Sequence, residues 1–335
     1  MSLRVLVTGA AGFIGSHVCE ALVARGDEVV GLDNFDPFYP RAVKERNLEA
    51  LRRGPRFRFV EADVARDALH LDGVELVLHL AAKPGVRPSL ENPASYSEAN
   101  ITGTVRVFEA ARRAGIRRVI FGSSSSVYGD ATPAPFAEDA PAVWPISPYA
   151  ASKRAGELMA HAFAHLYGVP IVCLRFFTVY GPRQRPDLAI HRFTDLIARD
   201  KPVRMHGDGS SERDYTYITD CVNGVLAAME WTARPASRKA GVAVAINIGG
   251  GARVRLDHLI QLIGRTLGRE VRIERHPDQP GDVRLTAADL HRAERELGYR
   301  PQVGIEEGVG EFVRWYEATY GRQSLASGGA GAGTI

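Results

Sequence analysis

Tyr149 and Lys153 are the residues whose types and spacing point first to chemistry. They lie four positions apart in the stretch Ser-Pro-Tyr-Ala-Ala-Ser-Lys, so both side chains rise from one face of a helix that begins near Tyr149. A tyrosine with an ordinary pKa near 10 is a poor base at neutral pH, but a lysine ammonium beside it would lower that pKa by roughly 1–3 units. Because such pairs also occur on solvated helices, the surrounding elements must decide whether this one transfers protons.

A glycine-rich turn near the N-terminus would supply the partner for such a pair. Residues 3–8 are typical of a short buried strand, followed by Gly9-Ala-Ala-Gly12-Phe-Ile-Gly15 and a helix pattern that stops at Gly26. Glycines at these positions permit a tight turn and close approach of the backbone to a pyrophosphate at the helix N-terminus. The pattern predicts a dinucleotide site, the alternative being a doubly wound domain that binds no dinucleotide.

The second expected strand, 28–32, ends at Asp33, which follows Gly15 by eighteen residues. A carboxylate there accepts hydrogen bonds from the adenosine ribose hydroxyls and repels a 2′-phosphate. The sequence therefore predicts NAD rather than NADP.

Strand and helix patterns continue to alternate along the first half of the chain. Strands are expected at 56–60, 76–80, 118–122 and 169–174, with an amphipathic helix at 101–114. This alternation predicts an α/β fold, a Rossmann-type doubly wound parallel sheet with ligands outside the strand carboxyl ends.

Beyond Thr178 the alternation breaks. A run at 241–248 could rejoin the sheet, and helices at about 256–267 and 305–320 would build a smaller α/β C-terminal substrate lobe. We expect an NAD-binding domain at 1–178, a lobe at 179–323 that mainly binds substrate, and a flexible Gly/Ala/Ser-rich tail at 324–335.

The composition limits the classes of function. The 335 residues are 45% hydrophobic and 24% charged, as in ordinary soluble proteins, and the net charge of +3 is too small to argue for nucleic acid. No apolar run reaches membrane-spanning length and no signal peptide is expected. The three separated cysteines, Cys19, Cys173 and Cys221, form neither a disulfide framework nor a metal pattern, which favours a reducing cytoplasm and predicts no metal.

The glycine spacing and the Tyr149/Lys153 pair together resemble the extended short-chain dehydrogenase/reductase superfamily, over almost the whole chain. The resemblance implies a cofactor site on motifs that follow in the expected order. Its residues would be Gly9, Ala11, Gly12, Phe13, Ile14, Gly15, Asp33, Asn34, Asp63, Val64, Leu80, Ala81, Ala82, Lys83, Asn100, Ser123, Tyr149, Lys153 and Phe176.

In this superfamily Tyr149 would be the base, Lys153 would hold the ribose hydroxyls, and Ser124 would hydrogen-bond the reacting oxygen. The related sugar-nucleotide dehydratases and decarboxylases carry acids in the loop where this chain has Ser125 and Ser126. With no acid there, the expected outcome is a 4-keto sugar that turns over and takes hydride back on its other face, which is 4-epimerisation.

Three stretches resemble the UDP-glucuronate 4-epimerases: 32–39, 85–93 and 176–187. A sugar carboxylate needs a bidentate arginine and hydroxyl donors, and the resemblance offers these in Arg185, Thr178, Ser125 and Ser126, with Arg87 as an additional candidate. The UDP would be held by Arg213 on the pyrophosphate and Asp282 at the uridine ribose, two residues that resemble the family's nucleotide loops.

Alternatives remain open at this point. They are UDP-glucose or UDP-N-acetylglucosamine 4-epimerase, UDP-glucuronate decarboxylase, and a non-catalytic NAD-binding regulatory protein. The family also pairs the helix after Lys153 and the helix at 101–114 with their symmetry mates, so a homodimer with a four-helix seam is expected. An apolar stripe on the first of these helices would form it: Leu158, Met159, Ala162, Phe163 and Leu166.

Overall fold

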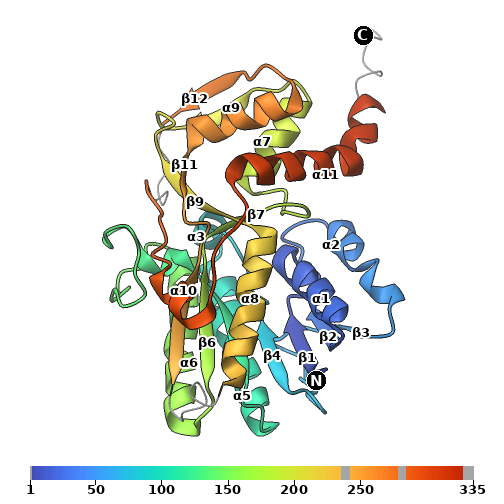
Figure 1. Cartoon of the computed structure of the whole chain (residues 1–335), viewed down its shortest axis with the longest axis vertical. Coiled ribbons are helices and arrows are strands. Elements are labelled where there is room, and N and C mark those ends of the chain that lie inside the picture. The colour runs from blue at the N-terminus through green and yellow to red at the C-terminus, as the bar shows by residue number, and fades with distance from the viewer. Residues whose placement is uncertain (1, 235–241, 278–283, 327–335) are drawn as a thin grey trace.

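The computed structural model describes residues 2–234, 242–277 and 284–326 of the chain. A larger part built on a parallel sheet carries a smaller part above it, and the chain passes between the two more than once (Figure 1). The predicted Rossmann-type α/β fold is confirmed.

Seven parallel strands form the main sheet, and their order places the first strand near the middle. In spatial order they are β10 (Ala243–Ile248), β6 (Ile171–Phe176), β5 (Val119–Ser124), β4 (Leu76–His79), β1 (Arg4–Thr8), β2 (Glu28–Asp33) and β3 (Phe57–Glu61). All seven strands in this sheet were predicted, each to within two residues at either end. β10 is the late strand that rejoins the sheet beside β6.

Helices cover both faces of the sheet. One face packs against α1 (Phe13–Arg25) and α8 (Ile218–Ala233), and the other against α5 (Gly103–Arg113) and α6 (Pro148–Tyr167). The predicted helix at 101–114 differs at its start, because residues Ser97–Thr102 form a π-helical turn, η2, before α5 begins. The strands buried between these layers explain the nearly continuous apolar runs in the sequence.

Two short sheets and several helices make up the smaller part. The remaining elements of the whole chain are, in order, α2 (Arg41–Leu48), η1 (Leu51–Arg53), α3 (Val86–Glu91), α4 (Pro93–Tyr96), η3 (Ser125–Tyr128), β7 (Thr178–Tyr180), α7 (Ala189–Ala198), β8 (Val203–His206), β9 (Glu212–Tyr217), β11 (Arg253–Arg255), α9 (Leu256–Leu267), β12 (Ile273–His276), α10 (His291–Leu297) and α11 (Ile305–Ala326). Strands β11, β9 and β7 pair in one sheet, and β12 pairs with β8.

The predicted division of the chain stays a prediction, but two observations bear on it. Helix α8 and strand β10 follow the expected boundary at residue 178, yet both pack with the large sheet. Helix α11 continues to Ala326, so the expected tail begins inside a helix, and residues 327–335 of that tail lie outside the described residues.

Helix α6 begins where the sequence predicted because its first turn is fully specified. The Ser147 hydroxyl accepts the backbone N–H of Ala150 at 3.1 Å, and Pro148 occupies the first helical position. Gly156 lets the helix approach β5 closely, since a Cβ there would lie 2.4 Å from the Phe121 ring. Together these features determine where α6 begins and how closely it packs on β5, and so where Tyr149 and Lys153 lie relative to the sheet.

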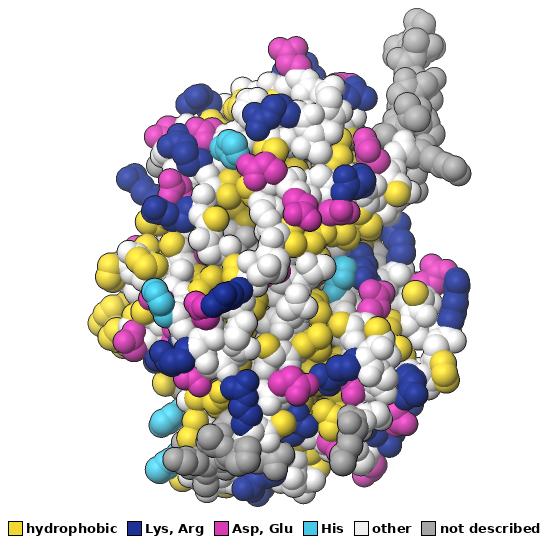
Figure 2. Space-filling model, in the orientation of Figure 1, with side chains coloured by type: hydrophobic (Ala, Val, Ile, Leu, Met, Phe, Trp, Pro, Cys, Tyr) yellow, Lys and Arg dark blue, Asp and Glu magenta, His cyan; other side chains and the backbone are white. Residues whose placement is uncertain are grey.

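On the face of the molecule shown in Figure 2, positive and negative side chains are intermingled. Within the described ranges, no helix is both long and apolar enough to cross a membrane.

Candidate active site

A cavity of about 440 Å³ lies at the carboxyl ends of the strands and extends to the segment 176–188. Most of the predicted site residues line it, whether they were assigned to cofactor or to substrate. They are Gly9, Gly12, Phe13, Ile14, Gly15, Asp33, Asn34, Asp63, Val64, Leu80, Ala81, Ala82, Lys83, Ser123, Ser124, Ser125, Ser126, Tyr149, Lys153, Phe176, Thr178 and Arg185.

The glycine turn, residues 9–15, forms one wall. Gly9 has a φ of +73°, and a Cβ on Gly15 would lie 2.0 Å from the Gly9 carbonyl oxygen, so side chains are excluded at both positions. Gly12 caps α1 with no side chain, which leaves the first backbone N–H groups of the helix accessible at the wall. This turn fits a pyrophosphate, as the sequence predicted.

Asp33 supports the glycine turn as well as lining the cavity. Its carboxylate accepts the backbone N–H of Ala11 at 3.2 Å and that of Phe35 at 2.8 Å, and the Lys44 ammonium lies 3.7 Å away. Burial raises the pKa of Asp33 above its usual value, although Lys44 and the two backbone donors lower it. Ala11 itself does not line the cavity, so its contribution is this backbone bond.

The loops after β3 and β4 form the opposite side. The Asn34 amide donates to Asp63 at 3.0 Å, which joins two residues predicted to meet the adenosine half. Asn100 is buried outside the cavity, where its side chain exchanges hydrogen bonds with the backbone of Lys83 at 2.7 and 3.0 Å and donates to Ser152 at 2.9 Å. Asn100 therefore fixes the loop beneath the cofactor position rather than touching the cavity.

The serine loop, residues 123–129, begins at the end of β5 and turns through η3. The Ser124 hydroxyl accepts hydrogen bonds from the backbone N–H of Ser126 at 3.2 Å and from the Ser126 hydroxyl at 2.9 Å. Ser124 is also hydrogen-bonded to Tyr149, which lowers the pKa of the phenol. Ser124, Ser125 and Ser126 all line the cavity, so the loop brings three serines to this wall.

Tyr149 and Lys153 both line the cavity, but their electrostatics differ from the sequence-based expectation. Burial raises the pKa of Tyr149, against the hydrogen bond with Ser124 and the charge of Arg185. The Lys153 ammonium instead donates to the Gly122 carbonyl at 2.7 Å, and burial lowers its pKa to about 8. The cation that lowers the tyrosine pKa is therefore Arg185, and it does not outweigh burial.

Thr178 and Arg185 line the end of the cavity formed by the segment 176–188. Arg185 forms a bidentate pair with Asp187, at 3.0 and 2.9 Å, and its guanidinium carbon lies 5.7 Å from the centre of the Phe38 ring. Burial lowers the pKa of Arg185, but the pair with Asp187, together with the nearby Tyr149 and Tyr39, raises it on balance, so the group stays charged. A cation held in a fixed plane beside hydroxyl groups can bind a carboxylate.

Two predicted substrate residues, Arg87 and Arg213, do not line this cavity. Arg87 is exposed on α3, and Arg213 lies on β9 outside the lining. Asp282 lies outside the described residues.

Sequence reasoning missed several lining residues, including three in the loop after β2. This loop contributes Asp36, Phe38 and Tyr39, and Lys44 follows from α2. The sequence could have predicted them. Phe38 and Tyr39 follow closely after Asp33, the acid predicted to bind the ribose, and aromatic residues in such a loop are well placed to cover a ligand. Other missed lining residues are Leu32, Ala62, Pro84, Gly85, Val86, Ala99, Gly122, Phe177, Val179 and Leu188.

His79 has no catalytic position. Its ring is hydrogen-bonded to the Thr8 and Thr104 hydroxyls at 2.8 and 3.0 Å, and burial lowers its pKa to about 3. It is a neutral core histidine. Among the described residues, no cluster of His, Cys, Asp and Glu is arranged to hold a metal ion.

The doubly wound sheet, the glycine turn and the Tyr149/Lys153 pair are typical of a dinucleotide-dependent enzyme. The cavity extends beyond the dinucleotide position to the segment 176–188, where a second ligand can bind. The model of the NAD dependent epimerase/dehydratase family matches residues 5–249. The chain belongs to this family, which confirms the superfamily predicted from the motifs.

Relatives and solved structures are similar over nearly the full length. A probable UDP-glucuronate 4-epimerase of Rhizobium meliloti is 40% identical over 338 residues, covering 96% of this chain and 98% of that protein. The UDP-glucuronate 4-epimerase of Thermodesulfobacterium geofontis is 38% identical over 316 residues, covering 92% and 95%. The structure of UDP-glucuronic acid 4-epimerase from Bacillus cereus, in complex with UDP-glucuronic acid and NAD, superposes with a TM-score of 0.89 at 37% identity, covering 95% of this chain and all of that one.

Proposed function

We propose that this protein is an NAD-dependent nucleotide-sugar 4-epimerase that interconverts UDP-glucuronate and UDP-galacturonate. The observation that carries the proposal is that one cavity joins the glycine turn, the Tyr149/Ser124 pair and, at its far end, Arg185 with Thr178. The similarity to UDP-glucuronate 4-epimerases over the whole chain supports the same substrate.

The residues present fit NAD. The glycine turn would hold the pyrophosphate, Asp33 the adenosine ribose and Lys153 the nicotinamide ribose. The chemistry supplied by bound NAD is reversible hydride acceptance.

Proton transfer falls to Tyr149. It removes the proton of the sugar 4-hydroxyl and returns it after the sugar has turned over, while Ser124 hydrogen-bonds the same oxygen. Since burial alone holds the phenol protonated, the Ser124 hydrogen bond and the Arg185 charge are what favour its phenolate form.

The acid-free serine loop favours epimerisation over elimination. Ser125, Ser126 and Thr178 offer hydroxyl donors near Arg185, and together they would hold the sugar carboxylate. The 4-keto intermediate is a β-keto acid, which loses carbon dioxide when the bond to its carboxylate aligns with the ketone π system. A clamp that keeps this bond out of alignment protects the intermediate.

The proposal is tested by supplying the purified protein with UDP-glucuronate and, separately, with UDP-glucose and UDP-N-acetylglucosamine. We expect UDP-galacturonate from the first, with little turnover of the other two. UDP-pentose as the main product would identify a decarboxylase, turnover of the neutral sugars alone would identify a different 4-epimerase, and NAD binding without any turnover would favour a regulatory protein.

We also propose a homodimer built on α6. Leu158, Met159 and Leu166 are 56%, 38% and 67% exposed, and with Ala162 they fall within about 100° of the helix circumference. Phe163, which was predicted to belong to this stripe, is half-buried and packs edge-on against Phe108 at 5.7 Å. An apolar stripe on a twenty-residue helix suits a second copy of the same helix, with α5 alongside.

Charges placed in this stripe should separate the two copies. The double substitution Leu158→Glu and Leu166→Glu is expected to lower the solution mass from about twice the chain mass of 36.5 kDa to that of one chain, measured by light scattering. Trp144→Glu is the matched control, since Trp144 is 74% exposed but lies outside α6. A wild-type monomer, or a double variant that stays dimeric, would contradict the four-helix seam.

The three cysteines of the chain are free and buried, which supports the cytoplasm as the proposed compartment.

A further inference from the structure

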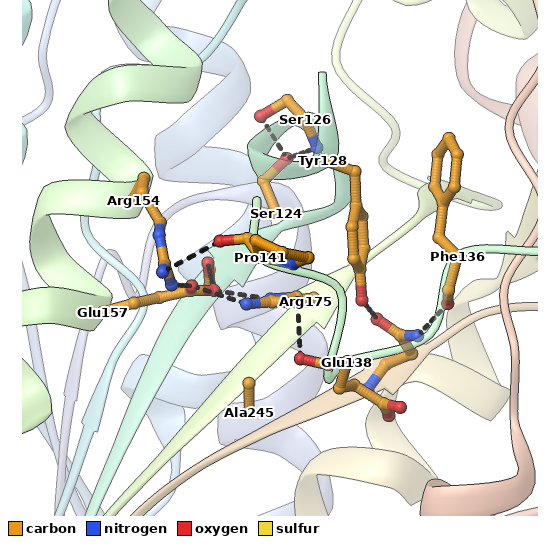
Figure 3. Close-up of polar contacts among 12 residues, drawn as sticks. Ser124, Ser126, Tyr128, Phe136, Glu138, Pro141, Arg154, Glu157, Arg175 and Ala245 are labelled. Carbon is orange, nitrogen blue, oxygen red and sulfur yellow. Dashed lines mark hydrogen bonds and ion pairs between the residues drawn. The ribbon is translucent and has the colours of Figure 1, made fainter. Parts of the chain in front are cut away.

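Glu157 lies one turn beyond Lys153 on α6, behind the cavity. Its carboxylate accepts the Ser123 hydroxyl at 2.7 Å, Arg175 Nε and Nη2 at 2.8 and 2.9 Å, and Arg154 Nη1 at 2.8 Å. Figure 3 shows Arg154 and Arg175 converging on Glu157 from two directions, below Ser124. One carboxylate thus joins α6 to the start of the serine loop and to β6.

The ion pair of Glu157 and Arg175 is buried, so a contribution to the stability of the fold is a poor explanation for it. The side chains of Glu157 and Arg175 are 4% and 3% exposed. A buried ion pair is often no more stabilising than an apolar replacement of the same volume. Charges kept in such a place are therefore candidates for a role in the neighbouring site.

Arg175 extends the support to the other end of the serine loop. Its guanidinium carbon lies 4.7 Å from the centre of the Tyr128 ring, and the Tyr128 hydroxyl donates to Asn247 at 2.7 Å. The loop that carries Ser124 is consequently held at Ser123 by Glu157 and at Tyr128 by Arg175.

Glu157 also determines the charge environment of Lys153. The titratable groups around this ammonium are Tyr149 and Glu157, each one turn away on α6, and His79 on β4, with Arg175 on β6 paired to Glu157. The ammonium also lies 5.2 Å from the centre of the Phe121 ring, an apolar neighbour. Tyr149 is protonated and His79 is neutral, so Glu157 is the anion among them. Burial lowers the pKa of Lys153 to about 8, and the Glu157 carboxylate opposes this shift.

We propose that Glu157 is a positioning residue of this site, which ties the serine loop to α6 and keeps Lys153 a cation at neutral pH. The proposal rests on the assignment of Lys153 to the ribose of NAD. Burial of a lysine beside a backbone carbonyl favours its neutral form, and within the described residues Glu157 is the anion that opposes this.

The test measures NAD affinity of the full-length protein as a function of pH, with turnover of UDP-glucuronate as a second readout. Wild-type affinity is expected to fall as pH rises through about 8, where Lys153 loses its proton. Glu157→Gln should move this midpoint to lower pH by about 1 unit, and the high-pH limb of kcat should move with it.

Three variants make the result decisive. Lys153→Met should abolish the midpoint, which shows that the midpoint reports this lysine. Arg154→Gln removes a partner of Glu157 but keeps its charge, so its midpoint should match that of the wild type. If Glu157→Gln fails to fold because Arg175 is left unpaired, the neutral pair Glu157→Gln/Arg175→Gln supplies the same measurement.

A Glu157→Gln midpoint equal to that of the wild type overturns the proposal, even if the variant is less stable, because a purely structural role would lower stability and leave the titration in place. Absence of turnover by the wild type would refute the proposed reaction and leave the NAD titration to judge Glu157. A midpoint that persists in Lys153→Met would overturn the assignment on which the proposal rests.

Discussion

Replacing Tyr149 with phenylalanine is expected to lower kcat on UDP-glucuronate by about 10³-fold and to leave NAD bound. In the proposed reaction, the substitution removes the hydroxyl that takes and returns the substrate proton, and general acid–base groups contribute typically about 10²–10⁴-fold. The ring remains, so packing against Tyr96 at 6.4 Å is kept, and the loss of one hydrogen bond with Ser124 should cost about 1 kcal/mol of stability. Product formation, thermal unfolding and the absorbance of bound cofactor measure the three effects.

The same structure provides a control for that substitution. Tyr96 packs edge-on against Tyr149, but its hydroxyl donates to the Pro84 carbonyl at 2.5 Å. Tyr96→Phe should therefore lower kcat by less than about tenfold, as expected for the loss of a structural hydrogen bond. If Tyr149→Phe kept a tenth of wild-type kcat, or if both variants lost activity equally, the tyrosine would have no specific place in proton transfer.

The strands of the large sheet could be predicted because their signal is local. Each is a short apolar run bounded by glycine or polar residues, and the ends agree to within two residues. The prediction agrees less well with the structure where contacts with a neighbouring element determine the backbone conformation. The π-helical turn Ser97–Thr102 packs against α4, α5 and α6, and its buried Asn100 is hydrogen-bonded to Lys83 and Ser152, contacts that no local sequence pattern predicts.

The division into lobes was harder to predict for a related reason. Residues 218–248 follow the lobe boundary in sequence, but α8 and β10 carry apolar faces that complete the large sheet. The spacing of apolar residues indicates that one face of an element is buried, but it does not indicate which other element covers that face. The strand at 241–248 was expected to rejoin the sheet, and the structure shows that it pairs with β6, whereas the packing of α8 on the same sheet had no such signal.

At the site, residues within one motif were predicted well and contacts between motifs were not. The glycine turn and the Tyr149/Lys153 pair each lie within a few residues, so spacing alone places them. The electrostatics of Tyr149 depend on Arg185, which lies thirty-six residues further on, and those of Lys153 on its bond to Gly122. Lysine has four rotatable bonds, so the position of its ammonium could not be taken from helix geometry.

We expect the second large effect at Arg185, because in the proposed reaction this residue both binds the sugar carboxylate and protects the 4-keto intermediate. Asp187 holds one edge of the guanidinium at 3.0 and 2.9 Å, which fixes the plane of the group at the cavity wall. The charge also lowers the pKa of Tyr149. Removing it should therefore weaken carboxylate binding and also make the phenolate harder to form.

Arg185→Gln is expected to lower kcat/KM for UDP-glucuronate by about 100-fold, since hydrogen bonds to charged groups contribute about 1.5–3 kcal/mol each. A freer carboxylate allows its C–C bond to align with the ketone of the intermediate. The bond then breaks, its electrons enter the enolate at C4, and carbon dioxide leaves. We consequently expect UDP-pentose to rise as a fraction of product, which separation and mass spectrometry would quantify.

Arg185→Lys distinguishes the clamp from simple charge. Lysine keeps a cation near Tyr149 but lacks the planar fork that binds a carboxylate through two parallel bonds. It should restore part of the lost kcat while leaving the UDP-pentose fraction high, because one ammonium cannot fix the rotation of the carboxylate. If the lysine variant instead suppressed UDP-pentose as fully as the wild type, charge alone would protect the intermediate. Wild-type kinetics and products in Arg185→Gln would place the sugar carboxylate elsewhere in the cavity.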